Sequence, residues 1–142
     1  MVAQEPDEER EPMTVADIAR RFDRKPHVVR NDWVGSPEWN RLVRRVGKRG
    51  RWVLYDAQGV EEFARGRVWL PPKESDIPAD RLLDQKEIAD YSGIGYSAVR
   101  SDISRGALGE PDEDRDGVRR WTRASVDRGF WARQIHRPKQ AE

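Results

Sequence analysis

Apolar side chains recur at helical spacing near the start of the chain. Thr14, followed three residues later by Asp17, has the pattern of a capping box at a helix N-terminus. One helix is therefore predicted over about residues 15–22. Its inward-facing residues are Val15, Ile18, Ala19 and Phe22.

A second helix is predicted to begin at Pro26, because proline at the first helical position gives up no intrahelical hydrogen bond. Val29 and Trp33 lie four residues apart and form its apolar face. Gly35-Ser36-Pro37 ends this helix. The stretch 38–46 has two interpretations: a short helix that begins at the preceding Ser-Pro pair, or an irregular link into a strand.

A basic hairpin is predicted next. The run Gly47-Lys48-Arg49-Gly50-Arg51 holds two glycines that allow a tight turn, together with three cations, and the β-prone run Trp52–Tyr55 follows it. Asp56 then caps a third helix that ends near Gly66. The inward-facing residues of this helix are Val60 and Phe63.

The second half of the chain predicts the same order of elements. Asp84 and Glu87 form a capping box, glycines make a turn at 93–95, and a helix follows over about 96–104. An acidic turn at 110–117 then leads into a returning strand and a last helix, which Thr122 caps. The inward-facing residues are Ile88, Ala89, Tyr91, Val99, Ile103, Val126 and Phe130.

The two halves are related by a sequence repeat. The stretch Lys25–Trp33 matches Gly95–Ile103 at a Val-Arg pair and at an aspartate, and an Ile-Ala pair precedes each stretch at the same spacing. Two copies imply tandem domains. The predicted organisation is a disordered acidic tail (1–12), a first domain (13–66), a Pro-rich linker (67–82), a second domain (83–133) and a C-terminal tail (134–142).

Charge is distributed unequally between the two halves. Residues 13–70 carry thirteen basic and seven acidic groups, whereas residues 83–142 carry eleven of each. A basic domain is the electrostatic footprint of a polyanionic partner, although the same balance also occurs on surfaces that are merely solvated.

Several classes of protein are excluded or disfavoured. The chain has no cysteine, so disulfides and thiolate metal sites are ruled out and a reducing cytoplasm fits. No apolar run approaches the roughly 20 residues of a membrane helix. His27 and His136 are far apart with no nucleophile nearby, and carboxylates lack metal-ligand spacing. We therefore expect no enzyme, no cofactor, no metal site and no membrane association.

Each half resembles the small winged helix-turn-helix of the MerR and excisionase (AlpA-like) superfamily. The shared features are an Ile-Ala helix, a Val-Arg helix, a basic or aromatic-tipped hairpin and a capped helix with Val, which cover about residues 13–66 and 83–133. The resemblance implies a mainly α fold with short β-hairpin wings, as two tandem winged helix-turn-helix domains. It also implies sequence-specific binding of double-stranded DNA by a bacterial or phage regulator, or by an excisionase-like recombination or architectural factor.

Candidate DNA contacts follow from how such domains bind, with a helix in the major groove and wing cations on phosphates. Arg30 and Arg100 occupy equivalent outward positions and would contact a guanine or a phosphate; the alternative is a surface salt bridge with Asp32 or Asp102. The full candidate set is Lys25, His27, Arg30, Asn31, Lys48, Arg49, Arg51, Ser97, Arg100, Ser101, Arg105, Arg119 and Arg120. The tryptophans assigned to the core are Trp33, Trp52, Trp121 and Trp131.

The two domains would act as a monomeric pseudo-dimer on adjacent half-sites, with higher assembly, a recombinase or another regulator as further possibilities. The second hairpin is acidic, which predicts that the first domain dominates affinity. Two alternatives belong to another class: a winged-helix protein-interaction adaptor, and a phage packaging component similar to a small terminase.

Overall fold

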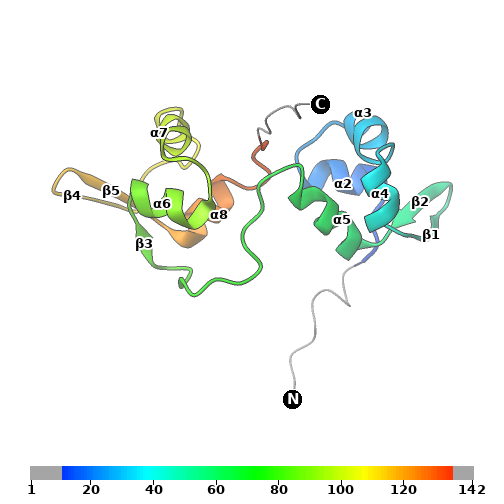
Figure 1. Ribbon diagram of the computed structural model, residues 1–142, viewed down its shortest axis with the longest axis horizontal. Helices are drawn as coiled ribbons and strands as arrows, with labels where there is room; N and C mark the ends of the chain where they lie inside the picture. Colours follow the sequence, from blue (N-terminus) through cyan, green and yellow to red (C-terminus); the bar gives the residue numbers. More distant parts are fainter. Residues whose placement is uncertain (1–10, 136–142) are drawn as a thin grey trace, which may run out of the picture. The chain divides into compact units, whose positions relative to one another are not determined.

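The computed structural model describes residues 11–135 of the 142-residue chain. They form two compact units, one made of residues 11–68 and 134–135, the other of Trp69–Arg133 (Figure 1). The fold is mixed α and β, with short helices and two small antiparallel sheets, which agrees with the predicted combination of helices and hairpins. The predicted tails fall mostly on residues 1–10 and 136–142, outside the described residues.

The first unit contains a helix pair, a short third helix, a hairpin and a final helix. The capping box of Thr14 and Asp17 and the placement of Pro26 at a helix start are both confirmed. Of the two interpretations of 38–46, the helix is observed, with Ser36 accepting a hydrogen bond from the backbone N–H of Trp39. In chain order the elements are α2 (Val15–Arg21), α3 (Pro26–Val28), η1 (Val29–Trp33), α4 (Pro37–Leu42), β1 (Arg45–Arg49), β2 (Trp52–Tyr55) and α5 (Ala57–Arg65).

The second helix of this unit changes geometry midway. After one α-helical turn it widens into the π-helical segment η1, where the N–H of Val34 donates to the carbonyl of Val29 at 2.9 Å. Val29 and Trp33 are buried as predicted, and His27, Arg30 and Asn31 are exposed. The widening was not predicted, because the apolar spacing of four residues suits an α-helix and a π-turn equally.

The basic hairpin is present, but its turn is shorter than predicted. Gly47 lies inside β1 opposite Leu54, next to a bulge, and only Gly50 and Arg51 form the turn. Gly50 has a φ of 62°, a conformation that favours glycine. Lys48 and Arg49 are therefore strand residues whose positions are set by pairing with β2.

Aromatic rings join the elements of the first unit. The ring of Trp33 lies 5.8 Å from that of Phe22 and 5.6 Å from that of Phe63. Trp39 continues the series, with its ring 5.1 Å from Phe63 and 5.2 Å from Tyr55. These five rings come from α2, η1, α4, α5 and β2 or flank them directly, so they hold the helices and the hairpin in one core.

Trp52 does not belong to this core, and its assignment there was wrong. Its side chain is 55% exposed, whereas Trp33 and Trp39 are almost completely buried. The cause is strand alternation: Trp52 stands three residues before the buried Tyr55, and residues an odd number apart point to opposite faces of a sheet.

The second unit repeats the helix pair, the hairpin and the final helix. The predicted capping box of Asp84 and Glu87 is confirmed, and Gly93 ends the first helix with a φ of 77°. Trp121 is buried as predicted, while Trp131 is half-buried. The elements are β3 (Leu82–Leu83), α6 (Gln85–Ser92), α7 (Tyr96–Ser104), β4 (Glu113–Arg115), β5 (Val118–Thr122) and α8 (Arg123–Gly129).

Part of the predicted acidic turn of the second unit, Glu113–Arg115, is a strand. Glu113 and Asp114 lie in β4 and pair across the sheet with Arg120 and Arg119. The actual turn is Asp116-Gly117, where both residues have positive φ. Each of these two acids therefore faces an arginine, which offsets much of the negative charge expected at this hairpin.

The Pro-containing segment expected as a linker at 67–82 is fastened to the second unit. Trp69 is buried against the rings of Tyr91 and Phe130 and donates from its indole nitrogen to the carbonyl of Ser92 at 2.9 Å. Farther along, Arg123 donates from Nε to the carbonyl of Ile77 at 2.7 Å. The segment thus provides a hydrogen-bond acceptor for Arg123, the first residue of α8. A linker that made no contact with the unit would not form this hydrogen bond.

We expect Gly59→Ala to destabilise the first unit by roughly 1–3 kcal/mol, the usual range for overpacking. A Cβ on Gly59 would stand 2.4 Å from the carbonyl oxygen of Leu42 and 2.7 Å from the capping carboxylate of Asp56. Helix propensity alone predicts the opposite sign, a gain of about 1 kcal/mol. Urea denaturation followed by circular dichroism measures the difference, and Gln58→Ala, at an exposed neighbour, is the control.

Candidate nucleic-acid interface

A concave surface lies between the start of α2, the second helix and the hairpin of the first unit; we call it the first groove. Its volume is about 620 Å³. The capping box places Asp17 on its α2 side, where Arg20 pairs with it, and the pairing of β1 with β2 places the hairpin residues on the other side. The charged and aromatic residues that line it are Asp17, Arg20, Arg30, Arg49, Arg51, Trp52 and Tyr55.

The first groove is electropositive, since four arginines line it against a single aspartate. The carboxylate of Asp17 is already engaged: it accepts hydrogen bonds from the backbone N–H of Thr14 at 3.1 Å and from Arg20 at 2.7 Å, and it lies 3.4 Å from Arg49. The pKa of this carboxyl is lowered first by the Thr14 N–H, then by the Thr14 side chain, and then by the positive charges of Arg49 and Arg20. The Arg49 side chain is still 56% exposed, so it can meet an anion in the groove together with Arg30 and Arg51.

The structure brings together three of the candidates predicted in the first half of the chain, Arg30, Arg49 and Arg51. The others in that half are exposed but do not line the groove; they are Lys25, His27, Asn31 and Lys48. His27 and Asn31 share the outward side of the second helix with Arg30, so that side is the one free to meet a ligand.

Two further residues of the first groove, Arg20 and Trp52, were not among the predicted contacts. Arg20 follows Asp17 by three residues on α2 and so lies on the same side of that helix. Trp52 follows from the alternation of β2 once Tyr55 is placed in the core. The signal for Arg20 was thus present in the helical spacing, whereas the signal for Trp52 depends on which face of β2 meets the core.

In the second unit, the exposed side of α7 forms a shallow hollow with the predicted residues Ser97, Arg100, Ser101 and Arg105. Arg105 is committed to an ion pair with Asp102, a buried carboxylate that also accepts from Nε of Arg133 at 2.5 Å. Within residues 11–135, neither Arg30 nor Arg100 forms a salt bridge with the neighbouring aspartate. The salt-bridge alternative for these two arginines is therefore not observed.

A second groove, the counterpart of the first, lies between α6, the start of α7 and the hairpin of the second unit. It is smaller, at about 280 Å³, and is lined by Lys86, Arg119 and the carboxylate of Asp84. Arg120, another predicted contact, does not line it and instead pairs with Glu113 at 3.0 Å. Its electrostatic attraction for an anion is weaker than that of the first groove.

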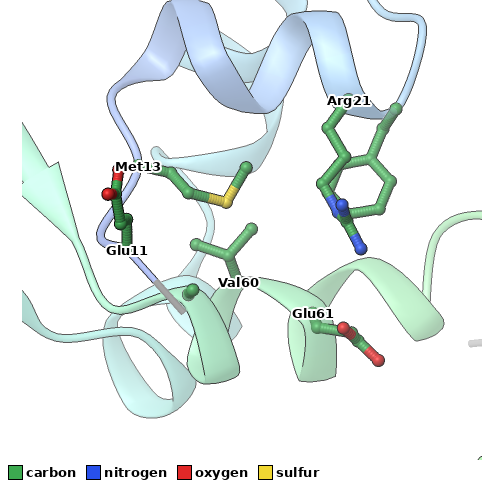
Figure 2. Close-up of a pocket in the computed structure, with 7 residues that line it drawn as sticks. Glu11, Met13, Arg21, Val60 and Glu61 are labelled. Atoms are coloured by element: carbon green, nitrogen blue, oxygen red, sulfur yellow. The ribbon is translucent and has the colours of Figure 1, made fainter. Parts of the chain in front are cut away.

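A further hollow of the first unit lies between α2 and α5 (Figure 2). Met13 and Val60 point toward each other in its interior, and Glu11, Arg21 and Glu61 lie around them. With a volume of only about 180 Å³ and two carboxylates among its lining residues, this hollow is poorly suited to a polyanion.

Comparison of the chain with protein-family models, with curated proteins and with solved structures found no match. None of the helices between residues 11 and 135 has the length and apolar character that crossing a bilayer requires.

We expect Asp17→Asn to lower the stability of the protein at neutral pH by roughly 1 kcal/mol, because the amide weakens a charged capping interaction. Since the pKa of Asp17 is lower in the folded state, this stabilisation is fully present above the ordinary aspartate pKa of about 3.9. It is lost as the pH falls below that value. Urea denaturation of both proteins from pH 7 to pH 3 should therefore show the difference shrinking at the acid end; a constant difference would contradict the assignment.

Proposed function

We propose that this protein binds double-stranded DNA in a sequence-specific manner through two tandem winged helix-turn-helix domains, as a bacterial or phage regulator or recombination factor. The observation that carries the proposal is the first groove, where four arginines lie beside a helix whose outward side is exposed. A helix that enters the major groove next to cations that grip phosphates is the arrangement such domains use.

In the first unit, α3 and η1 would enter the major groove. Arg30 would contact a guanine or a phosphate, with His27 and Asn31 on the same exposed side. Arg49 and Arg51, carried by the hairpin, would hold the phosphate backbone, and the strand pairing of β1 and β2 fixes their reach.

The second unit would contribute less to affinity. Its groove is smaller, and two acids of its hairpin are opposite the arginines that would otherwise face phosphates. Arg100 remains available on α7 at the position equivalent to Arg30. Because both units belong to one chain, binding of the second would be effectively intramolecular.

A second candidate function concerns the second unit alone, as a protein-interaction module. Tyr96 and Val118 both line its groove and are 52% and 36% exposed. An apolar pair with balanced charge around it suits a protein surface better than a phosphate backbone.

We expect the double variant Arg30→Ala, Arg49→Ala to bind duplex DNA more weakly and with a shallower salt dependence. The slope of log K against log salt concentration should fall by about one unit for each lost phosphate contact. The matched control is Arg41→Ala with Arg44→Ala, two exposed arginines of the same unit that do not line the groove. Fluorescence anisotropy across a salt series compares the two. An equal loss of DNA affinity in both variants would mean that the groove arginines contribute no more to binding than other exposed arginines. A wild-type affinity independent of salt would refute electrostatic binding.

We also expect Arg30→Ala to reduce affinity more than Arg100→Ala, since only Arg30 lies in a strongly electropositive groove. If either arginine forms a bidentate contact with guanine, its loss should remove roughly 1–3 kcal/mol of preference at one base pair. Binding to a randomised duplex library, with selection and sequencing, measures both effects. A larger effect of Arg100→Ala would reverse the ranking, and no effect of Arg100→Ala would favour the protein-interaction function of the second unit.

A further inference from the structure

Trp52 is the exposed aromatic residue of the first groove. Its side chain is 55% exposed, although two other tryptophans of the same unit are 2–3% exposed. Leaving a large apolar ring in water gives up the free energy that its burial would provide. A ligand that covers the ring would recover that free energy.

The position of Trp52 is fixed from two sides. It pairs with Arg49 across the hairpin, and Arg49 is itself held by the carboxylate of Asp17. The guanidinium carbon of Arg51 lies 4.9 Å from the centroid of the Trp52 ring, within the range of a cation–π contact. Arg51 therefore covers part of the ring and positions it, while Trp52 also lines the groove.

The other side of the groove supplies cationic and flat apolar partners. Pro26 begins the second helix there, and Arg30 follows one helical turn later. A ring with arginines around it is the combination by which proteins hold unpaired nucleotides: the base stacks on the aromatic ring, and the phosphates contact the cations.

We propose that the first groove binds an unpaired nucleotide, with its base stacked on Trp52 and its phosphates held by Arg30 and Arg49. This rests on the proposed function only in that a nucleic acid occupies the groove. In an intact duplex both faces of each base are covered by neighbouring bases, so an indole gains a stacking partner only where a base is unstacked. The ligands are therefore single strands, mismatched bubbles and strongly kinked steps.

The second unit lacks this arrangement on its hairpin. Asp56 caps the helix that follows the first hairpin, and Thr122 caps the helix that follows the second. Four positions before each capping residue stands Trp52 in the first unit and Val118 in the second. Val118 offers no ring on which a base could stack. The exposed ring of the second groove, Tyr96, lies instead at the start of α7, and that groove holds two cations against the four of the first, so the proposal is made for the first groove.

The test uses the full chain and three fluorescent DNAs of one sequence: a perfect duplex, the same duplex with a three-base mismatch bubble, and the single strand. Anisotropy at fixed salt gives the affinities. We expect the bubble to bind about tenfold more tightly than the perfect duplex, the size of one base–aromatic stack. Trp52→Leu, which keeps an apolar side chain but removes the ring, should abolish this preference, whereas Trp52→Phe should retain most of it.

A second measurement detects the stacked base directly. A fluorescent adenine analogue such as 2-aminopurine, placed in the bubble, should be quenched when the wild-type protein stacks it on Trp52, and quenching should be absent with Trp52→Leu. Equal affinity of the wild type for bubble and perfect duplex, or a preference that survives in Trp52→Leu, would overturn the inference while duplex binding still stands. Binding of the single strand and bubble without the perfect duplex would support it and refute the proposed function.

Discussion

The contacts among five aromatic rings in the first unit are the constraint on which the rest of that unit depends. Trp33 and Trp39 each touch Phe63, and the series ends at Phe22 on one side and Tyr55 on the other. The rings come from separate elements of a small polar chain that has few other large side chains to bury. Because Tyr55 ties the hairpin to the core and Trp33 ties the second helix to it, the same contacts set the separation between the two sides of the first groove.

The two units show how one sequence pattern supports different surfaces. The equivalent aspartates, Asp32 and Asp102, differ in burial. Asp32 is exposed, whereas Asp102 is buried and pairs with Arg105 and Arg133. That buried pairing takes Arg105 out of the set of cations available to a ligand. Both copies of the repeat therefore have the helices and the hairpin. The charged residues around them differ: some form buried ion pairs that stabilise a unit, and others stay exposed to a ligand.

Much of the fold could be predicted from the sequence because its signals are local. The capping boxes at Thr14 and Asp84 and the apolar spacing of the helices depend only on neighbours in the chain. The pairing of β3 with β5, and the docking of Trp69, depend on contacts across tens of residues that no local pattern encodes. The candidate site divides in the same way: Arg30 follows from helical spacing, whereas the exposure of Trp52 requires knowing which face of β2 meets the core.

The chain returns to the first unit after completing the second, since Val68 forms a bridge with Gln134 and the N–H of Trp69 donates to the carbonyl of Arg133 at 2.7 Å. In topological terms the second unit is an insertion into the first. During synthesis on the ribosome, the residues of the aromatic core, from Phe22 to Phe63, emerge before the second unit. The closing bridge of the first unit must wait until all 65 residues of the second unit, from Trp69 to Arg133, have been translated. All residues that line the first groove are thus translated before Gln134, whose bridge with Val68 closes the unit that carries the groove.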